Sequence, residues 1–250
     1  MNDKSICIVG CCMNVEKYLP EVLANLETIE PWWKESKVVI FENDSTDDTN
    51  KIIRAWANKK PGQRTIVTEY NLNERIVDRV ERLAYIRNRL LDYVPNSFDY
   101  FMMIDLDDVF TTPVSKESFD SCFALDNWDV MTAVGYGNKY YDIWPLRIPG
   151  IIEFDCWREY YKLWRSGKYS QQEATTEAIE KFKDLVPTFT QPVVVYSAFN
   201  TAMLAKVSTL HRCCKYNSHD GSQMICEHVP FQNCLRSHGA RIVLNPNFRL

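Results

Sequence analysis

The run Tyr100-Phe101-Met102-Met103-Ile104-Asp105-Leu106-Asp107-Asp108 decides the fold class of this chain. Its first five residues are apolar or aromatic, which is typical of a strand buried on both faces of a parallel sheet. The run then ends in three carboxylates within four positions. Because ligands of open α/β sheets bind outside the carboxyl ends of the strands, the sequence predicts a ligand site here.

Two interpretations of the acidic segment are open. Single aspartates often follow strands as turn or cap residues, so a capped loop is one of them. Crowded carboxylates, however, repel one another unless a cation or several donors compensate. Asp105 and Asp107 offer hard oxygen ligands to a divalent cation, Mn²⁺ or Mg²⁺, and we expect them to bind one.

Apolar runs alternate with amphipathic helical patterns over at least residues 5–110. The alternation predicts right-handed βαβ units and an α/β fold with a mostly parallel central sheet flanked by helices. Strands are expected at residues 5–9, 37–41, 65–69, 100–104, 129–133, 193–197 and 241–244, and helices at 15–26, 47–56 and 74–94. Residues 142–192 are predicted to form an insertion or a lid over the sheet. A single domain is expected to span residues 1–250.

The composition excludes several classes of protein. A net charge of -4, a pI near 5.7 and the lack of any Lys/Arg run argue against a nucleic-acid binder. The N-terminal apolar stretch is too short for a signal sequence, and no other run is long enough to span a membrane. Nine scattered cysteines do not resemble the disulfide framework of a small secreted domain. We therefore expect a cytoplasmic protein.

A second polar segment follows the second predicted strand at Glu42, Asn43 and Asp44. One interpretation is a strand–turn–helix junction with good caps. The other is that these groups bind the polar edges of a base or a ribose. We favour the second, because this strand end faces the same crevice as the end of the first strand, near Cys11 and Asn14.

Arg87 interrupts the apolar stripe of the helix expected at 74–94. The stripe consists of Ile76, Val80, Leu83, Leu90 and Val94. A guanidinium on a buried face needs an anion. One interpretation is that Arg87 snorkels or pairs with a structural carboxylate such as Asp92. The second is that it reaches a diphosphate or the carboxylates at 105–107. On the second interpretation, Arg87→Met should change thermal stability little. Arg79 and Arg82 are expected on the solvated face.

Several motifs follow one another in a fixed order at 14–19, 42–49, 105–107, 140–147 and 226–228, the last preceding 239–242. In this order they resemble the nucleotide-sugar glycosyltransferases of the GT-A fold. More narrowly, they are similar to the cryptococcal capsule mannosyltransferase-like group, family 69, and its relatives in large DNA viruses. The resemblance extends from about Ser5 to Leu244. It implies metal-dependent transfer of a sugar from a UDP- or GDP-sugar to a hydroxyl of a glycan acceptor, with about 1–110 binding the donor and about 111–250 the acceptor.

The resemblance also suggests roles for individual residues. The donor would contact Cys11, Asn14, Glu42, Asn43, Asp44, Arg87, Asp105 and Leu106, and the metal would be held by Asp107 and Asp105. The acceptor would contact Asp142, Trp144 and Asn200. An inverting enzyme needs a base, which would be Glu227 or its neighbour His228. A retaining enzyme needs none, so the stereochemistry is open.

Two other functions compete with sugar transfer. A nucleotidyltransferase would use the same metal and diphosphate chemistry, but Gly10-Cys11-Cys12-Met13-Asn14 lacks the glycines and the cation expected of its phosphate loop. A non-catalytic carbohydrate-binding protein could lose its acidic motifs, yet Asp105, Asp107 and Glu227 are present. The composition of the 10–14 loop thus counts against a nucleotidyltransferase, and the acidic residues count against a non-catalytic protein.

The last forty residues contain all four histidines and also Cys213, Cys214, Cys226 and Cys234. A zinc site is disfavoured by spacing, since there is no Cys-x-x-Cys or His-x3-His pair and adjacent cysteines cannot easily serve one tetrahedral ion. Buried thiols and surface histidines are expected instead.

Overall fold

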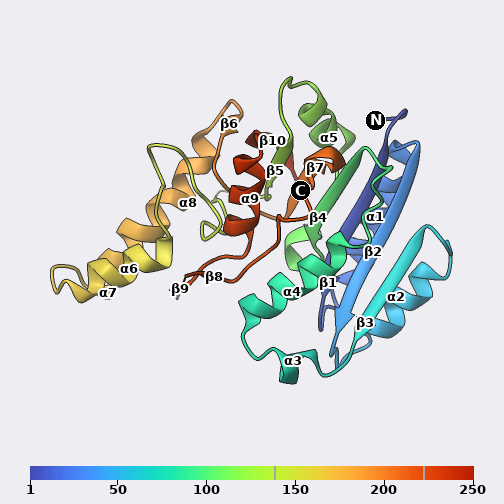
Figure 1. Ribbon diagram of the computed structural model, residues 1–250, viewed down its shortest axis with the longest axis horizontal. Helices are drawn as coiled ribbons and strands as arrows, with labels where there is room; N and C mark the ends of the chain where they lie inside the picture. The colour runs from blue at the N-terminus through green and yellow to red at the C-terminus, as the bar shows by residue number, and fades with distance from the viewer. Residues whose placement is uncertain (138, 222) are drawn as a thin grey trace.

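An eight-stranded sheet forms the centre of the computed structural model, which describes residues 1–137, 139–221 and 223–250 (Figure 1). The strand order is β3-β2-β1-β4-β7-β5-β10-β6. The strands are β1 Ser5–Cys12, β2 Glu35–Asn43, β3 Arg64–Glu69, β4 Tyr100–Asp105, β5 Val130–Val134, β6 Val193–Val194, β7 Ala202–Lys206 and β10 Ile242–Arg249, and β8 His219–Asp220 pairs separately with β9 Gln223–Met224. Only β6 and β7 run against the other strands of the sheet, so the predicted mostly parallel sheet is confirmed.

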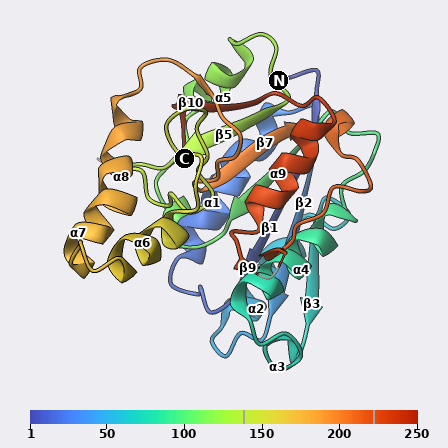
Figure 2. The same ribbon diagram turned by 60° about the vertical axis from the view of Figure 1, so that its left-hand side comes forward.

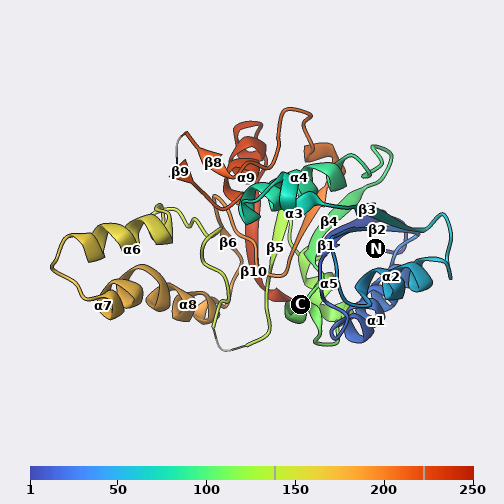
Figure 3. The same cartoon turned by 90° about the horizontal axis from the view of Figure 1, so that it is seen from below.

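Helices cover both faces of the sheet (Figure 3). They are α1 Leu19–Ile29, α2 Thr49–Ala57, α3 Leu72–Arg75, α4 Arg79–Leu91, α5 Lys116–Phe123 and α9 His228–Ser237. Side chains alternate along a strand, so Ile6 and Ile8 of β1 pack toward α1, α2 and α5, whereas Cys7 and Val9 pack toward α4 and α9. Single 3-10 turns lie at Glu30–Trp32, Asp108–Phe110, Val186–Thr188 and Val207–Thr209. The sheet is thus buried between two hydrophobic layers.

The predicted insertion forms a helical arm that projects beyond the β6 edge of the sheet (Figures 1 and 3). It contains α6 Cys156–Arg165, α7 Gln171–Thr175 and α8 Lys181–Leu185, and a π-helical turn at Thr176–Glu180 joins the last two. Its buried residues, among them Ala178 and Phe182, continue the core layer that lies on the α4 and α9 face. The arm therefore lies beside the edge of the sheet and is not a lid above it.

Several elements differ from the sequence prediction, and the strand expected at 193–197 is limited to Val193–Val194. The helix expected at 74–94 is broken, because the Asp78 side chain accepts the Glu81 backbone N–H at 2.8 Å and starts α4 at Arg79. The antiparallel strand β7 was not predicted, because its residues, Ala-Met-Leu-Ala-Lys, favour helices. Pairing with β4 on one side and β5 on the other imposes the strand conformation.

A close approach between β1 and β4 shapes the carboxyl end of the sheet. A Cβ on Gly10 would lie 2.7 Å from the Ile104 carbonyl oxygen and 2.8 Å from the Leu106 Cγ, so only glycine fits here. The resulting register places Cys11 opposite Asp105. The acidic end of β4 is thereby held beside the end of β1.

Candidate active site

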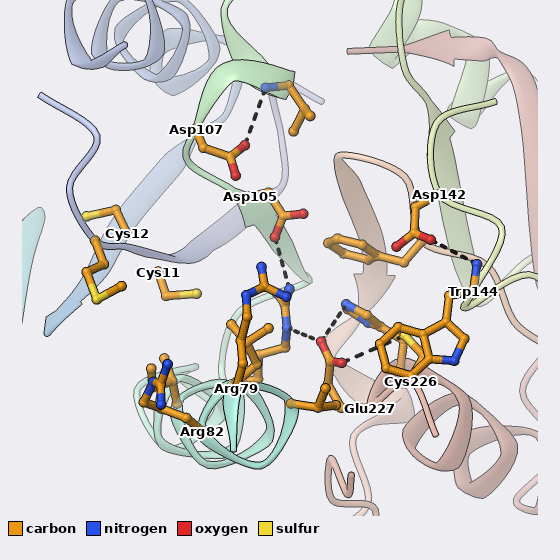
Figure 4. Close-up of a pocket in the computed structure, with 18 of the residues that line it drawn as sticks. Cys11, Cys12, Arg79, Arg82, Asp105, Asp107, Asp142, Trp144, Cys226 and Glu227 are labelled. Carbon is orange, nitrogen blue, oxygen red and sulfur yellow. Dashed lines mark hydrogen bonds and ion pairs between the residues drawn. The ribbon is translucent and has the colours of Figure 1, made fainter. Parts of the chain in front are cut away.

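A cavity of about 300 Å³ lies at the carboxyl ends of β1, β2 and β4 (Figure 4). Its walls come from these strands, from α4, from the loop before the arm and from the start of α9. The charged and polar residues that line it include Cys11, Asn43, Arg79, Arg82, Arg87, Asp105, Asp107, Asp142, Trp144, Cys226, Glu227 and His228. Most of the residues that the sequence singled out are thus brought together.

A buried arginine joins two elements of this cavity. The Nη2 of Arg87 donates to Asp105 Oδ1 at 2.9 Å, and its Nε donates to Glu227 Oε1 at 3.0 Å. Burial opposes the charge of Arg87, but the two carboxylates outweigh burial and raise its pKa. The alternative partner Asp92 pairs with Arg89 instead. Arg87 therefore connects the acidic strand end to the start of α9.

Asp107 has the electrostatic character expected of a cation ligand. Burial, and then the neighbouring Asp105, raise the pKa of the Asp107 carboxyl to about 6. Its Oδ1 accepts the Val109 backbone N–H at 3.3 Å, and Arg87 bonds only one oxygen of Asp105. Oxygens of both aspartates are therefore available on one side of the cavity, a donor set that fits Mn²⁺ or Mg²⁺.

Two further arginines face the aspartates across the cavity. Figure 4 shows Arg79 and Arg82 on the α4 side, opposite Asp107. Arg82 donates to the carbonyls of Ile76 and Val77 at 2.6 and 3.2 Å. Arg79 is exposed and Arg82 is half-buried, as a solvated helix face predicts, but both side chains also line the cavity. The cavity therefore has a cationic wall and an acidic wall.

Glu227 and His228 lie together at the start of α9, and both are buried. Glu227 Oε1 is 3.5 Å from His228 Nε2, and neither imidazole nitrogen has a hydrogen-bond partner among the described residues. The His228 ring stacks on Phe199 with centroids 3.7 Å apart. Burial, and then the charge of Arg87, lower the pKa of His228 well below its usual value, so this histidine is neutral.

The loop before the arm supplies a carboxyl and an indole. Burial raises the pKa of Asp142 to about 6, and its Oδ1 accepts the Trp144 backbone N–H at 2.8 Å. The Trp144 indole N–H donates to Asp155 Oδ2 at 2.8 Å, and Asp155 also pairs with Arg147 at 3.0 Å. These bonds fix the indole beside the cavity.

Three predicted donor residues are outside the group of described residues that line the cavity. Glu42 and Asp44 lie at the β2–α2 junction, and Asn14, which follows β1, bonds to that junction. Glu42 accepts the Ser45 backbone N–H at 3.0 Å and also bonds the Asn50 amide. Asn14 and Asp44 accept backbone N–H groups too, at 2.7 and 2.8 Å. The junction interpretation therefore describes their present contacts, and donor binding by these three residues stays a prediction.

Leu106 and Asn200 are also outside that lining group. Leu106 is buried behind Gly10. The Asn200 amide is buried close to Gly135, and both its polar atoms are without partners within the described ranges. Phe199, the residue before Asn200, does line the cavity.

The sheet order and the acidic strand end define the GT-A fold, and solved structures agree. A mannosyltransferase, PcManGT from Pyrobaculum calidifontis in complex with GDP-Man and Mn²⁺, aligns over 100% of this chain and 56% of its own with a TM-score of 0.55 and 15% identity. Residues 1–349 of TarS from S. aureus, in complex with UDP-GlcNAc, align with 96% of this chain and with 55% of the TarS chain. The TM-score is 0.54 and the sequence identity is 15%. The chain thus spans a little over half the length of these proteins.

Sequence comparison gives a narrower assignment for part of the chain. Residues 7–118 match the family model described as Glycosyl transferase family 2. This segment includes most of β1, all of β2, β3 and β4, and both Asp105 and Asp107. No curated protein matches the chain. Within the described ranges, no helix has both the length and the apolar character needed to cross a membrane.

Proposed function

We propose that this protein is a metal-dependent glycosyltransferase that moves a sugar from a UDP- or GDP-sugar to a hydroxyl of a glycan acceptor. The observation that carries the proposal is the cavity itself, in which Asp105 and Asp107 face Arg79 and Arg82 and a buried carboxylate, Glu227, lies near both. The family match and the ligands of the similar structures support it. Membership of the family 69 group with its viral relatives, and a cytoplasmic location, are parts of the same proposal.

The donor would bind through the half of the chain formed by about residues 1–110. Asp107 and Asp105 would hold Mn²⁺ or Mg²⁺, which stabilises negative charge on a leaving diphosphate when bound. Arg79 and Arg82 would donate hydrogen bonds to the phosphate oxygens. Asn43 and Cys11 lie on the same edge and would contact the nucleoside.

We propose Glu227 as the base if transfer inverts the anomeric carbon. Its neighbour His228 is neutral and so could accept a proton, but burial and Arg87 disfavour the charged product of that step. Arg87 orients Glu227 through the 3.0 Å bond to Oε1. The other oxygen, Oε2, would then take the acceptor proton.

The acceptor would bind through about residues 111–250, on the side of Asp142 and Trp144. Trp144 borders a second hollow, which Trp157 and Tyr161 of α6 line with Met224. Trp157 and Tyr161 are 46% and 44% exposed. Because aromatic faces stack on the C–H groups of sugars, we expect a glycan to continue from the cavity along this hollow. Asn200 stays a candidate acceptor ligand.

The test is a screen of UDP- and GDP-sugars for hydrolysis or transfer with Mn²⁺ and with a chelator. Asp107→Asn should abolish activity, because it removes a charged ligand while keeping the shape. Asp108→Asn is the matched control, since Asp108 is the exposed neighbour outside the cavity lining. Activity that survives both chelation and Asp107→Asn would contradict the proposal.

A further inference from the structure

Three sulfur atoms and an imidazole converge at the C-terminal end of α9, away from the cavity. Cys214 and Cys234 are joined by a disulfide. Cys213 Sγ lies 3.6 Å from His238 Nε2, and one ligand atom from each of the four residues lies within 4.8 Å of all the others. Cys213 and His238 are partly or fully accessible to solvent. His238 is a surface histidine, as predicted, but the prediction of buried thiols is wrong for this cluster, because Cys213 is exposed and Cys214 and Cys234 form a disulfide.

A disulfide alone does not account for this arrangement, because it needs only two of the four groups. His238 Nδ1 is 2.9 Å from the Cys234 carbonyl oxygen, which fixes its proton there and leaves the lone pair of Nε2 facing Cys213. Histidines that bind zinc are held in this way by a carbonyl or a carboxylate. Tetrahedral zinc also places a sulfur and a nitrogen ligand about 3.6 Å apart. The observed separation of Cys213 and His238 agrees.

We propose that the reduced protein binds one zinc ion through Cys213, Cys214, Cys234 and His238. The disulfide is then the metal-free, oxidised form of the same site. An external dithiol supplies two electrons and two protons to the Cys214–Cys234 bond and becomes a disulfide itself. Zinc replaces the protons of the three thiols, and these protons pass to solvent. A reducing compartment favours the zinc form.

The spacing argument against zinc fails because tertiary contact assembles the ligands. Cys213 and Cys214 lie in a turn that is closed by the Cys214 backbone N–H, which donates to the His211 carbonyl at 2.9 Å. Cys234 and His238 are four residues apart, so they share one face at the end of α9. Both adjacent sulfurs lie within 4.8 Å of the other ligand atoms, so adjacency is no obstacle here.

The cluster supports the two helices that line the cavity. Figure 2 shows α9 beside α4 on one face of the sheet. Asn88 of α4 exchanges hydrogen bonds of 2.9 and 2.8 Å with the Tyr216 backbone, and the Tyr216 ring stacks on Phe231 of α9 at 4.2 Å. Tyr216 follows Cys214 by two residues. Zinc or the disulfide would therefore hold α9 against α4, where Glu227 meets Arg87.

The experiment uses the full chain, freed of metal and reduced with dithiothreitol. Zn²⁺ uptake is measured by competition with a coloured chelator, and Co²⁺ substitution is followed by its thiolate charge-transfer absorption. We expect one ion per chain. Cys213→Ser and His238→Ala should each weaken Zn²⁺ binding roughly 10-fold or more. His219→Ala, a change at an exposed histidine outside the cluster, should leave it unchanged.

The oxidised protein provides a second test. It should take up no Zn²⁺, and Cys213→Ser should still form the Cys214–Cys234 disulfide, which a thiol count after alkylation checks. This variant is expected to fold because Cys213 is exposed. Equal Zn²⁺ binding by reduced wild type, Cys213→Ser and His238→Ala would show that the site is a disulfide only and would overturn the proposal.

Discussion

Replacement of Arg87 by methionine tests the central ion pair. Methionine preserves the length of the side chain and the apolar face of α4, which is why the sequence alone predicts little loss of stability. The structure reverses that expectation. The side chains of Arg87 and Glu227 are only 4% and 5% exposed, so Arg87→Met leaves the Glu227 carboxylate buried without its cation.

The expected cost follows from this burial. Breaking a buried ion pair by removing one partner costs about 3–5 kcal/mol. The Asp105 side chain is 30% exposed, so loss of its bond to Arg87 adds little. For a domain of this size, each kcal/mol lowers the melting temperature by roughly 2–4 °C, which gives a decrease of about 6–20 °C. Glu227→Gln should lower the stability less, because Arg87 then still pairs with the Asp105 carboxylate.

Urea unfolding of wild type, Arg87→Met, Glu227→Gln and the double variant measures these terms. The double variant should be more stable than the sum of the single losses implies, by about 1–3 kcal/mol, because the unpaired charge is gone. Arg89→Met is the matched control on the same helix, since Arg89 is 41% exposed and should change stability by less than about 1 kcal/mol. A loss below about 1 kcal/mol for Arg87→Met, or strict additivity, would refute the reasoning.

The remaining predictions concern the proposed reaction. Since the pKa of Asp107 is raised to about 6 from an ordinary 3.8, Mn²⁺ affinity should fall by about 10-fold per pH unit below pH 6, as calorimetry can measure. The same shift means that the stability contributed by protonated Asp107 is present below pH 3.8 and lost as pH rises through 6, so metal-free Asp107→Asn should be at least as stable as wild type at pH 7.5. Glu227→Gln should lower turnover roughly 10²- to 10⁴-fold with little change in donor affinity, and near-normal turnover with an inverted product by NMR would exclude Glu227 as the base. Trp157→Ala should raise the acceptor KM several-fold and leave kcat unchanged, and an unchanged KM would remove the second hollow from the acceptor site.

The parts of the site that lie at strand ends could be predicted from the sequence. Carboxyl ends of parallel strands meet at one edge of a sheet, so Cys11, Asn43, Asp105 and Asp107 were expected together and line one cavity. The burial of Arg87 followed from its place in an apolar stripe. These inferences depend on local pattern and on a general rule of topology.

The other parts depend on contacts between distant segments. The pairing of Arg87 with Glu227, 140 residues further on, has no signal in either segment alone. The strand β7 has residues that favour a helix, and only its neighbours in the sheet make it a strand. In each case tertiary context overrides a local preference.

The charges of the cavity lining explain why donor binding should require a metal. The lining holds four carboxyl groups and three guanidinium groups, on Asp105, Asp107, Asp142, Glu227, Arg79, Arg82 and Arg87. With His228 neutral, the ionised lining carries a small negative excess, which would repel a diphosphate. One divalent cation at Asp105 and Asp107 reverses the sign of that excess next to the cationic wall. Under the proposed function, the arginines alone would be too few to bind a diphosphate donor, because Arg87 is already shared between Asp105 and Glu227.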